Sequence, residues 1–453
     1  MKKHLYFAAM ALAVMSSCSN DDVVDNPGTT PIDDEQAVAI ELGLSAPQAM
    51  VTTRGMGTVG STDAEQNLWK GQTLHVVMLD ESEDPIKEAA DDEGTIFDNA
   101  TLTFQAPTQT TTDDDNTIKI LDGAGDIKAR YYPSTGKYSF YGYHIDNIEG
   151  STFNVADKTV TGITITGTED LMAAKTKTVE EATYADIWGD ITVEDQALVA
   201  DRAFSAWTAR RGIQPILQFN HLLTRLQFNV IAGQASAARF SYNGASWTEN
   251  LSPANLPNDE EDQNKSTAVF ITGIKVKNVK TSEITIDLDA QTATSAAATA
   301  DQELELKGTT DTDTNGNLDD LTATAPEGFL ESGNDETHPT KTQVGESIML
   351  LPGDAEIELE IAVSQLVVDT ENATTEEAKT YTTKTETLTA TIKASDIKQT
   401  GSTTDSANKT TFEAGDSYNI NITVYSFQRI EVSAELTAWK EGGDINIAPG
   451  DQF

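Results

Sequence analysis

Cysteine is almost absent from this chain of 453 residues, which has a single one, Cys18. A lone cysteine excludes a framework of internal disulfides. Histidine is scarce as well, with five residues at positions 4, 75, 144, 221 and 338 and no HExxH spacing among them. The sequence also lacks a Gly-x-Ser-x-Gly elbow and a phosphate-cradling glycine loop. Carboxylates are too abundant for counting to exclude a glycosidase pair, but nothing singles one pair out. We therefore expect that the protein is not an enzyme.

Positive charge is the next deficit. The chain has 30 Lys and Arg against 73 Asp and Glu, which gives a formal net charge of −43. This balance argues against nucleic acid as a partner and against polybasic attraction to anionic lipid. It also means that any self-assembly has to overcome repulsion through backbone pairing and apolar burial.

Long hydrophobic runs are missing too. The apolar stretch at residues 5–15 is far shorter than the ~20 residues that span a bilayer, and it follows Lys2 and Lys3. A short apolar run behind a positive start is typical of a cleaved signal peptide. The stretch AVMSSC at residues 13–18 indicates a lipoprotein signal whose Cys18 is acylated, for example by palmitate. A spare cysteine in an ordinary signal peptide is the alternative.

Residues 19–36 are acidic, carry Pro and Thr and have few large apolar side chains. Such a segment cannot bury enough surface to fold, so we predict a flexible tether. Its first residues, SNDD at 19–22, resemble the acidic export signal of lipoproteins on the outer face of certain Gram-negative outer membranes. The predicted location is therefore the cell surface, with the outer membrane reached through the lipid.

Alternation of apolar and polar residues recurs along the rest of the chain and predicts β-strands. Helical periods are scarce, and no repeat of 20 to 50 residues is present. A change in character near residues 210–215 predicts a boundary between a domain at 37–213 and a second domain at 214–453. The alternating apolar sets that carry the all-β prediction are Val38–Leu44, Leu74–Met78, Ile284–Leu288 and Ile357–Val363.

Four motifs, in this order, carry a resemblance to a known family. They are YYPSTGKYSFYGY at 131–143, DLMA at 170–173, FNHLLTRL at 219–226 and FEAGDSY at 412–418. Together with the lipoprotein signal they resemble the fimbrillins, the lipoprotein pilins of type V pili. The resemblance implies two tandem transthyretin-like β-sandwich domains with few short helices. It also implies a structural pilus subunit, located in the fimbrium, that supports cell adhesion.

The resemblance implies an assembly mechanism as well. In fimbrillins an Arg-specific protease removes the lipid anchor together with the first strand. Here the cut would fall between Arg54 and Gly55, downstream of the strand predicted at 38–44. Loss of that strand would expose unpaired edge groups and an apolar groove. A strand from another pilus subunit would then fill the groove, giving a homo- or hetero-polymer.

The expected donor strand lies in the C-terminal region, where small and large apolar residues alternate. An ordinary last strand of the chain's own sheet is an equally good interpretation of this pattern. Ile445 and Ile447 follow beyond it. The alternating residues are Ile430, Val432, Ala434, Leu436 and Ala438.

One loop has the spacing of a metal site. Oxygen-bearing side chains recur at alternate positions around Gly316, as a Ca²⁺ loop requires. The loop departs from an EF-hand because Thr322 stands where a bidentate glutamate is needed. A Ca²⁺ loop and a plain acidic loop both remain open, and we expect that no cofactor is required. The candidate ligands are Asp311, Asp313, Asn315 and Asp319.

Two further expectations concern single motifs. His221 stands in an apolar segment, which favours a hydrogen-bonded core histidine over a catalytic base. Tyr138 and Phe140 alternate with Tyr141 and Tyr143, so one aromatic set is expected in a core and the other on a sheet face. Exposed aromatics there would suit the main alternative function, a monomeric lipid-anchored glycan-binding protein, with or without Ca²⁺. Either function leaves room for a receptor on a host or bacterial surface.

Overall fold

The fold is given by a computed structural model, in which the chain divides into two units, residues 1–36 and 37–453. All described residues belong to the second unit. They are residues 38–40, 42–45, 47–48, 73–80, 95–103, 117–120, 131–132, 138–146, 150–154, 156–176, 204–210, 215–257, 262–310, 312, 318–330, 339–369, 380–399, 407–437, 440–441 and 445–447.

The described residues confirm the all-β prediction. Strands dominate them, and the helical elements are one α-helix and three 3₁₀ turns of three or four residues each. Within these residues no helix has the length and apolar character needed to cross a membrane. The helical elements are α3 (Ala206–Ala209), η1 (Ala235–Ala237), η2 (Asp262–Asn264) and η3 (Ala394–Asp396).

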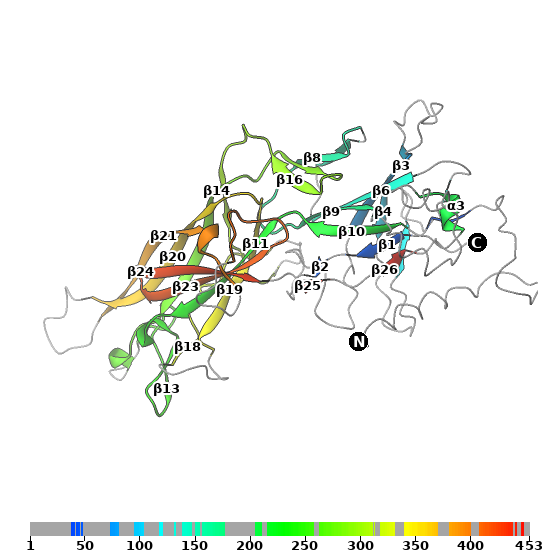
Figure 1. Cartoon of the computed structure of the whole chain (residues 1–453). Coiled ribbons are helices and arrows are strands. Elements are labelled where there is room, and N and C mark those ends of the chain that lie inside the picture. The colour runs from blue at the N-terminus through cyan, green and yellow to red at the C-terminus, as the bar shows by residue number, and fades with distance from the viewer. Residues whose placement is uncertain are drawn as a thin grey trace, which may run out of the picture. The chain divides into compact units, whose positions relative to one another are not determined.

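Eight strands form a sheet that closes on itself as a barrel (Figure 1). Strands from both ends of the chain are needed to close it, because β1 pairs with β26. In spatial order the strands are β1 (Leu42–Ser45), β10 (Ile216–His221), β9 (Leu171–Thr176), β6 (Tyr138–Ile145), β3 (Thr73–Asp80), β4 (Thr95–Thr103), β5 (Thr117–Ile120) and β26 (Ile445–Ile447).

A four-stranded sheet shares an apolar core with strands β3, β6 and β9 of the barrel. Ile284 and Ile286 from this sheet and Tyr141 and Tyr143 from β6 are all buried in that core. Successive strand residues point to opposite faces, and both faces of β6 are covered, so all eight of its residues are buried. The sheet consists of β16 (Thr292–Ser295), β15 (Ile284–Asp287), β8 (Thr159–Ile163) and β7 (Thr152–Asn154).

This arrangement corrects one expectation. Tyr138 and Phe140 are buried as predicted for one aromatic set, but Tyr141 and Tyr143 are buried as well and do not line an open sheet face. The reason is nonlocal, since the covering hairpin β15–β16 comes from more than 130 positions further along the chain. The aromatic stretch therefore offers no exposed tyrosine pair for a sugar.

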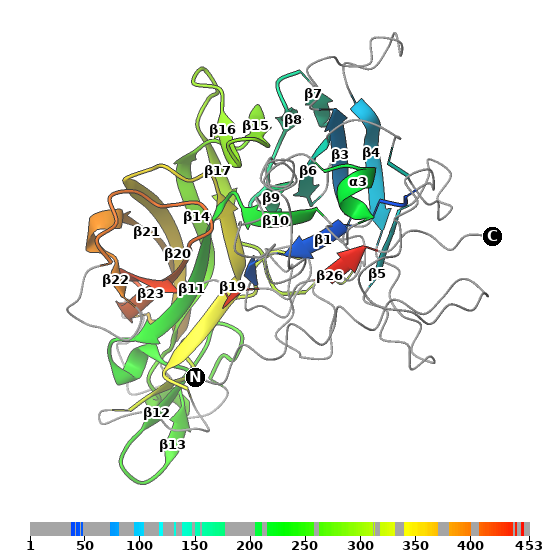
Figure 2. The ribbon, with the colours of Figure 1, turned by 45° about the vertical axis from the view of Figure 1, so that its right-hand side comes forward.

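A second core lies between a five-stranded and a four-stranded sheet, which together form a sandwich (Figure 2). The predicted alternation of Ile357 to Val363 is confirmed, because these apolar residues are buried in this core. The five-stranded sheet is β19 (Lys341–Leu350), β11 (Thr224–Ala232), β23 (Ser417–Ser426), β24 (Arg429–Thr437) and β22 (Lys398–Gln399); the other is β17 (Gln302–Glu305), β14 (Val269–Val279), β20 (Glu356–Val368) and β21 (Tyr381–Lys393).

Two small sheets complete the fold. They are β13 (Trp247–Glu249) with β12 (Phe240–Tyr242) and β18 (Gly328–Phe329), and β2 (Pro47–Gln48) with β25 (Lys440–Glu441). The predicted domain boundary at 213/214 falls inside the second compact unit. Strands on its two sides share sheets, because β10 pairs with β9 and β15 pairs with β8. The boundary at that position stays a prediction.

Candidate strand-exchange site

The first strand of the described chain, β1, lies between two strands that are far from it in sequence. It pairs in parallel with β10 through three registered positions, from Gly43 opposite Ile216 to Ser45 opposite Gln218. It pairs antiparallel with β26 through three more, from Leu42 opposite Ile447 to Leu44 opposite Ile445. We call the space between β10 and β26 the β1 slot. Without β1, both of these strands would become sheet edges with unpaired N–H and C=O groups.

The residues just before β1 are also anchored. Ile40 is fully buried, and the Tyr132 amide donates a 2.9 Å hydrogen bond to the Val38 carbonyl. Ala39 forms an isolated antiparallel bridge with Tyr131. The strand predicted at 38–44 is thus split into a bridge at 39 and a ladder that begins at Leu42.

A second short strand follows β1 and binds the other C-terminal strand. Pro47 of β2 lies opposite Glu441 of β25, and Gln48 lies opposite Lys440. Among the described strands, β2 is the one sheet partner of β25. The segment 42–48 therefore pairs with both β25 and β26. Its removal would leave β25 without a partner among the described strands and β26 paired with β5 alone.

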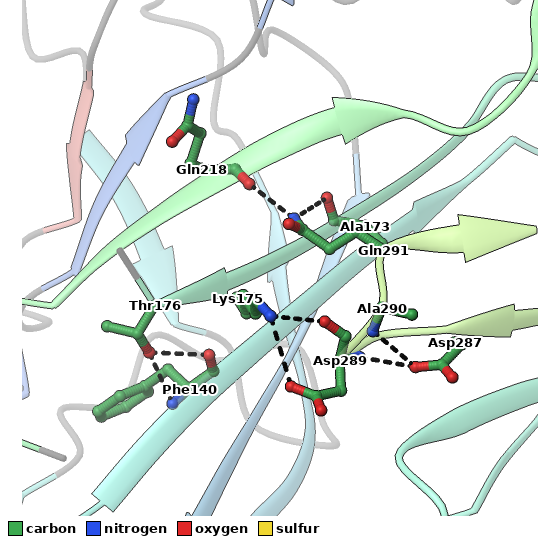
Figure 3. A network of polar contacts seen from close by, with 9 residues as sticks. All are labelled: Phe140, Ala173, Lys175, Thr176, Gln218, Asp287, Asp289, Ala290 and Gln291. Carbon is green, nitrogen blue, oxygen red and sulfur yellow. Dashed lines mark hydrogen bonds and ion pairs between the residues drawn. The ribbon is translucent and has the colours of Figure 1, made fainter. Parts of the chain in front are cut away.

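A polar network fixes the wall of the slot formed by β10 (Figure 3). The Gln291 amide Nε2 donates to the carbonyl oxygens of Gln218 and Ala173, both at 3.2 Å. The Lys175 ammonium donates to the Asp289 carbonyl at 2.6 Å. Asp287 shapes the turn, since its Oδ1 accepts from the amides of Asp289 and Ala290. The β15–β16 turn thereby ties β9 to β10 beside the position of β1.

A buried pair of titratable side chains joins the end of β10 to the start of β9. His221 Nδ1 is 2.7 Å from Asp170 Oδ2, and both side chains are fully shielded from solvent. This confirms the predicted hydrogen-bonded core histidine. Arg225 is also buried, and its Nε donates to Ser347 Oγ at 2.9 Å. Burial lowers the pKa of Arg225 to about 10, an effect that the charges of Glu346 and Asp170 partly oppose.

A second acid–histidine pair adjoins the first. Asp146 Oδ1 is 3.1 Å from His144 Nε2, and Asp146 Oδ2 accepts from the Asp170 amide at 3.0 Å. Burial by itself raises the pKa of Asp146, but the charge and hydrogen bond of His144 and the bond from Asp170 bring that pKa below its usual value. These carboxylates and imidazoles cross-link the ends of β6, β9 and β10.

The four family motifs converge here. Tyr143 of the first lies opposite Ala173 of the second in the β6–β9 ladder. The second and third meet where Met172 lies opposite His221. The fourth binds the third through the Arg225 amide, which donates to the Asp416 carbonyl at 3.0 Å. Motif residues thus build the junction at which β10 leaves the barrel and β11 enters the sandwich.

Most of the other predicted site residues lie outside the described part of the chain. Asp319 is described, and its carboxylate accepts from the Thr310 and Thr312 hydroxyls and from the Thr312 amide at 3.0 to 3.2 Å. Across the described residues, no three His, Cys, Asp or Glu side chains gather in a way that could hold a metal ion. Ca²⁺ binding at this loop stays a prediction. The residues outside the description are Cys18, Arg54, Gly55, Asp311, Asp313, Asn315 and Ala438.

The predicted donor strand is β24, and it occupies a place in the chain's own sheet. It pairs with β23 at nine registered positions, from Thr437 opposite Ser417 to Arg429 opposite Ser426. Ala434 is buried in the sandwich core, and Ile430, Val432 and Leu436 pack against that core. Its donation to another subunit stays a prediction. Sequence reasoning missed the pairing of β25 with β2, because two-residue strands carry no periodic signal.

No family model matches the chain, and no curated protein matches it. It is similar to the crystal structure of a candidate cell adhesion protein from Bacteroides uniformis, with 15% identity, a TM-score of 0.40 and coverage of 90% of this chain and 99% of that one.

Two similar structures are fimbrial proteins from Porphyromonas gingivalis. The fimbrial anchor protein Mfa2 has 10% identity, a TM-score of 0.29 and coverage of 89% of this chain and 99% of its own. The tip fimbrial protein Mfa3 has 9% identity, a TM-score of 0.30 and coverage of 89% and 100%. At such identities and TM-scores, function has to be argued from this chain's own residues.

Proposed function

We propose that the protein is a surface-exposed structural subunit of a pilus that supports cell adhesion and has no catalytic role. It reaches the outer membrane through lipid on Cys18 and is assembled by strand exchange after cleavage between Arg54 and Gly55. Its partners are an Arg-specific protease and other pilus subunits. The observation that carries the proposal is the position of β1, which three registered pairs hold on each side between β10 and β26.

Short ladders make β1 the right strand to exchange. A hydrogen bond contributes only about 0.5–1.5 kcal/mol net to stability, and the three-position ladders of β1 contrast with the thirteen-position ladder between β20 and β21. Burial of a side chain such as Ile40 adds roughly 1.5–3 kcal/mol. An incoming strand that pairs with β10 and buries its own apolar side chains can overcome the repulsion between acidic subunits.

The same cut also prepares the donor. The segment released upstream of Gly55 contains β1 and β2, which pair with β26 and β25 respectively. Cleavage would therefore open the slot and loosen β25 and β26 in a single step. We place the leading end of the donor region in these two strands, with the predicted strand 430–438 behind them.

Proteolysis of the full chain tests this proposal. We expect an Arg-specific protease to cut first after Arg54, giving a product that begins at Gly55, and the product to form ladders on a gel and a sizing column. An Arg54→Gln variant should stay uncut at this position and remain monomeric. A cut product that stays monomeric under all conditions would refute strand exchange and favour the lipid-anchored glycan-binding alternative.

Paired substitutions locate the donor. Ile445→Asp with Ile447→Asp should suppress the ladders and leave the cleaved monomer folded, because burying an unpaired charge between subunits is costly. Val432→Asp with Leu436→Asp should also lower the monomer's unfolding free energy, since both side chains pack against its own core. Ladders that survive the first pair but not the second would confine the donor to β24.

A further inference from the structure

A groove of about 300 Å³ lies beside the three-stranded sheet β13–β12–β18. The hairpin of β12 and β13 projects from the end of the sandwich (Figures 1 and 2). Ligand sites begin near this size and combine an apolar surface with a few fixed polar groups. The polar residues that line the groove are Arg239, Glu249, Ser252, Asn255, Thr324, Glu327 and Thr342, and Phe270 is its aromatic residue.

Arg239 is held in place at the groove by three neighbours. Its Nε lies 3.3 Å from Glu249 Oε1, its Nη1 lies 3.7 Å from Glu327 Oε2, and its guanidinium stands 5.1 Å from the centroid of the Phe240 ring. About half of the Arg239 side chain is nevertheless exposed. The groove thus presents planar, pre-oriented donors and acceptors to solvent.

An aromatic pair extends the same surface. Tyr242 lies opposite Trp247, and Phe240 lies opposite Glu249, in the β12–β13 ladder. Residues that face each other across a ladder, and residues two apart in a strand, share one face of a sheet. The Tyr242–Trp247 pair, with ring centroids 5.3 Å apart, therefore lies about 7 Å along the strands from Glu249 on its face. Tyr242 is 37% exposed.

We propose that this groove and the Tyr242–Trp247 pair form a binding site for a neutral oligosaccharide. Carboxylate, guanidinium and amide groups bind neighbouring hydroxyls in a bidentate manner. Aromatic rings pack against the apolar C–H face of a sugar ring, and they retain a polar edge at a wet interface. Phe270 in the groove and the aromatic pair on the hairpin suit sugar rings at two positions of one chain.

The charged side chains of the groove determine which class of saccharide it would bind. The groove holds one guanidinium and two carboxylates, on a chain with a net charge of −43. A sialylated or sulfated glycan would meet this negative field, so the site favours uncharged sugars. An extended peptide would instead pair with the edge strand β13 and would leave the polar groove unused.

A glycan array tests the proposal on the purified, uncleaved full chain, with neutral, sialylated and sulfated glycans side by side. We expect binding to neutral oligosaccharides alone. Calorimetry with the best neutral oligosaccharide of the array should then show at least tenfold weaker binding for Trp247→Ala, Asn255→Ala and Arg239→Gln. Thermal unfolding would confirm that each variant is folded.

Arg429→Gln is the matched control. Arg429 also stands over an aromatic ring, 4.3 Å from the Tyr425 centroid, and pairs with Glu431 at 3.0 Å, but it does not line the groove. Its substitution should leave glycan affinity unchanged. No neutral glycan bound, tighter binding of acidic glycans, equal effects of the two arginine variants, or competition by extended peptides would each overturn the proposal. Because the uncleaved chain is used, the outcome is independent of pilus assembly.

Discussion

The barrel and the sandwich differ in the length of the hydrogen-bonded ladders between their strands. In the barrel, β1 and β26 are held by ladders of two or three registered positions. In the sandwich, β23 and β24 share nine positions and β20 and β21 share thirteen. Each short strand of the barrel can be removed at a small loss of backbone pairing, whereas each long strand of the sandwich is locked. The weakly paired strand β1 of the barrel is the one for which we propose exchange, and the long ladders of the sandwich offer no comparable strand.

The largest effect is expected at the junction of the two regions. Asp170→Ala removes the buried partner of His221 and a charge that acts on Arg225. Leaving buried polar groups without their hydrogen-bond partner costs about 1–3 kcal/mol, and more for a charged group such as Arg225, and urea unfolding would measure this loss. Hydrogen exchange should show lost protection in β9 and β10 and preserved protection in β20 and β21.

Equal loss of protection in both regions would show that the barrel and the sandwich open together, which would contradict a difference in stability between them. Glu303→Gln is the surface control. Glu303 is paired with Lys275 and Lys277 on the exposed side of the sandwich, where ion pairs contribute little. It should leave the exchange pattern of both regions unchanged.

A smaller effect on the unfolding free energy would distinguish the tight side-chain packing of the barrel from that of the sandwich. A Cβ added at Gly142 of β6 would lie 2.7 Å from Cζ of the buried Phe219. Gly142→Ala should therefore lower the unfolding free energy by about 1–3 kcal/mol through overpacking. At Gly273 of β14 the nearest atom would be 3.6 Å away, so Gly273→Ala should change it by less than about 0.5 kcal/mol. A denaturant titration of both variants checks the order, and a tolerant Gly142 would argue for a loosely packed barrel.

A further effect is a pH dependence of stability that originates at His75 in the barrel. Burial, with a contribution from the charge of His144, lowers the pKa of His75 from 6.5 to about 4. The unfolded chain then binds a proton more readily, so this stabilisation is complete above pH 6.5 and is lost as pH falls toward 4. His75→Phe keeps a ring against Tyr143, which the imidazole stacks on at 4.7 Å. The variant should lose less stability than the native chain between pH 7.5 and 4.5, and parallel curves would exclude His75 as the cause.

Much of the fold could be predicted from local pattern. Alternation along residues 357–363 and 284–288 gave strands whose apolar sides are buried, and the scarcity of helical periods agreed with the few short helices. The core role of His221 followed from its apolar neighbours. Each of these predictions depends on a periodicity that a strand imposes on its own sequence.

What could not be predicted depends on distant segments. The burial of Tyr141 and Tyr143 depends on the β15–β16 hairpin. The convergence of the four motifs and the hydrogen bond from Gln291 to the Gln218 carbonyl depend on tertiary contact as well. The groove at Arg239 draws on residues from 239 to 342, and no spacing rule connects them.

The pairing of Leu42 with Ile447 has a consequence for biosynthesis. A ribosome makes Leu42 about 400 residues before its neighbour Ile447 in the barrel, so the barrel cannot close until Ile447 has been made. Contacts of such high sequence separation slow folding. Slow closure would keep the chain unfolded for longer, which suits the export across a membrane that our proposed function requires.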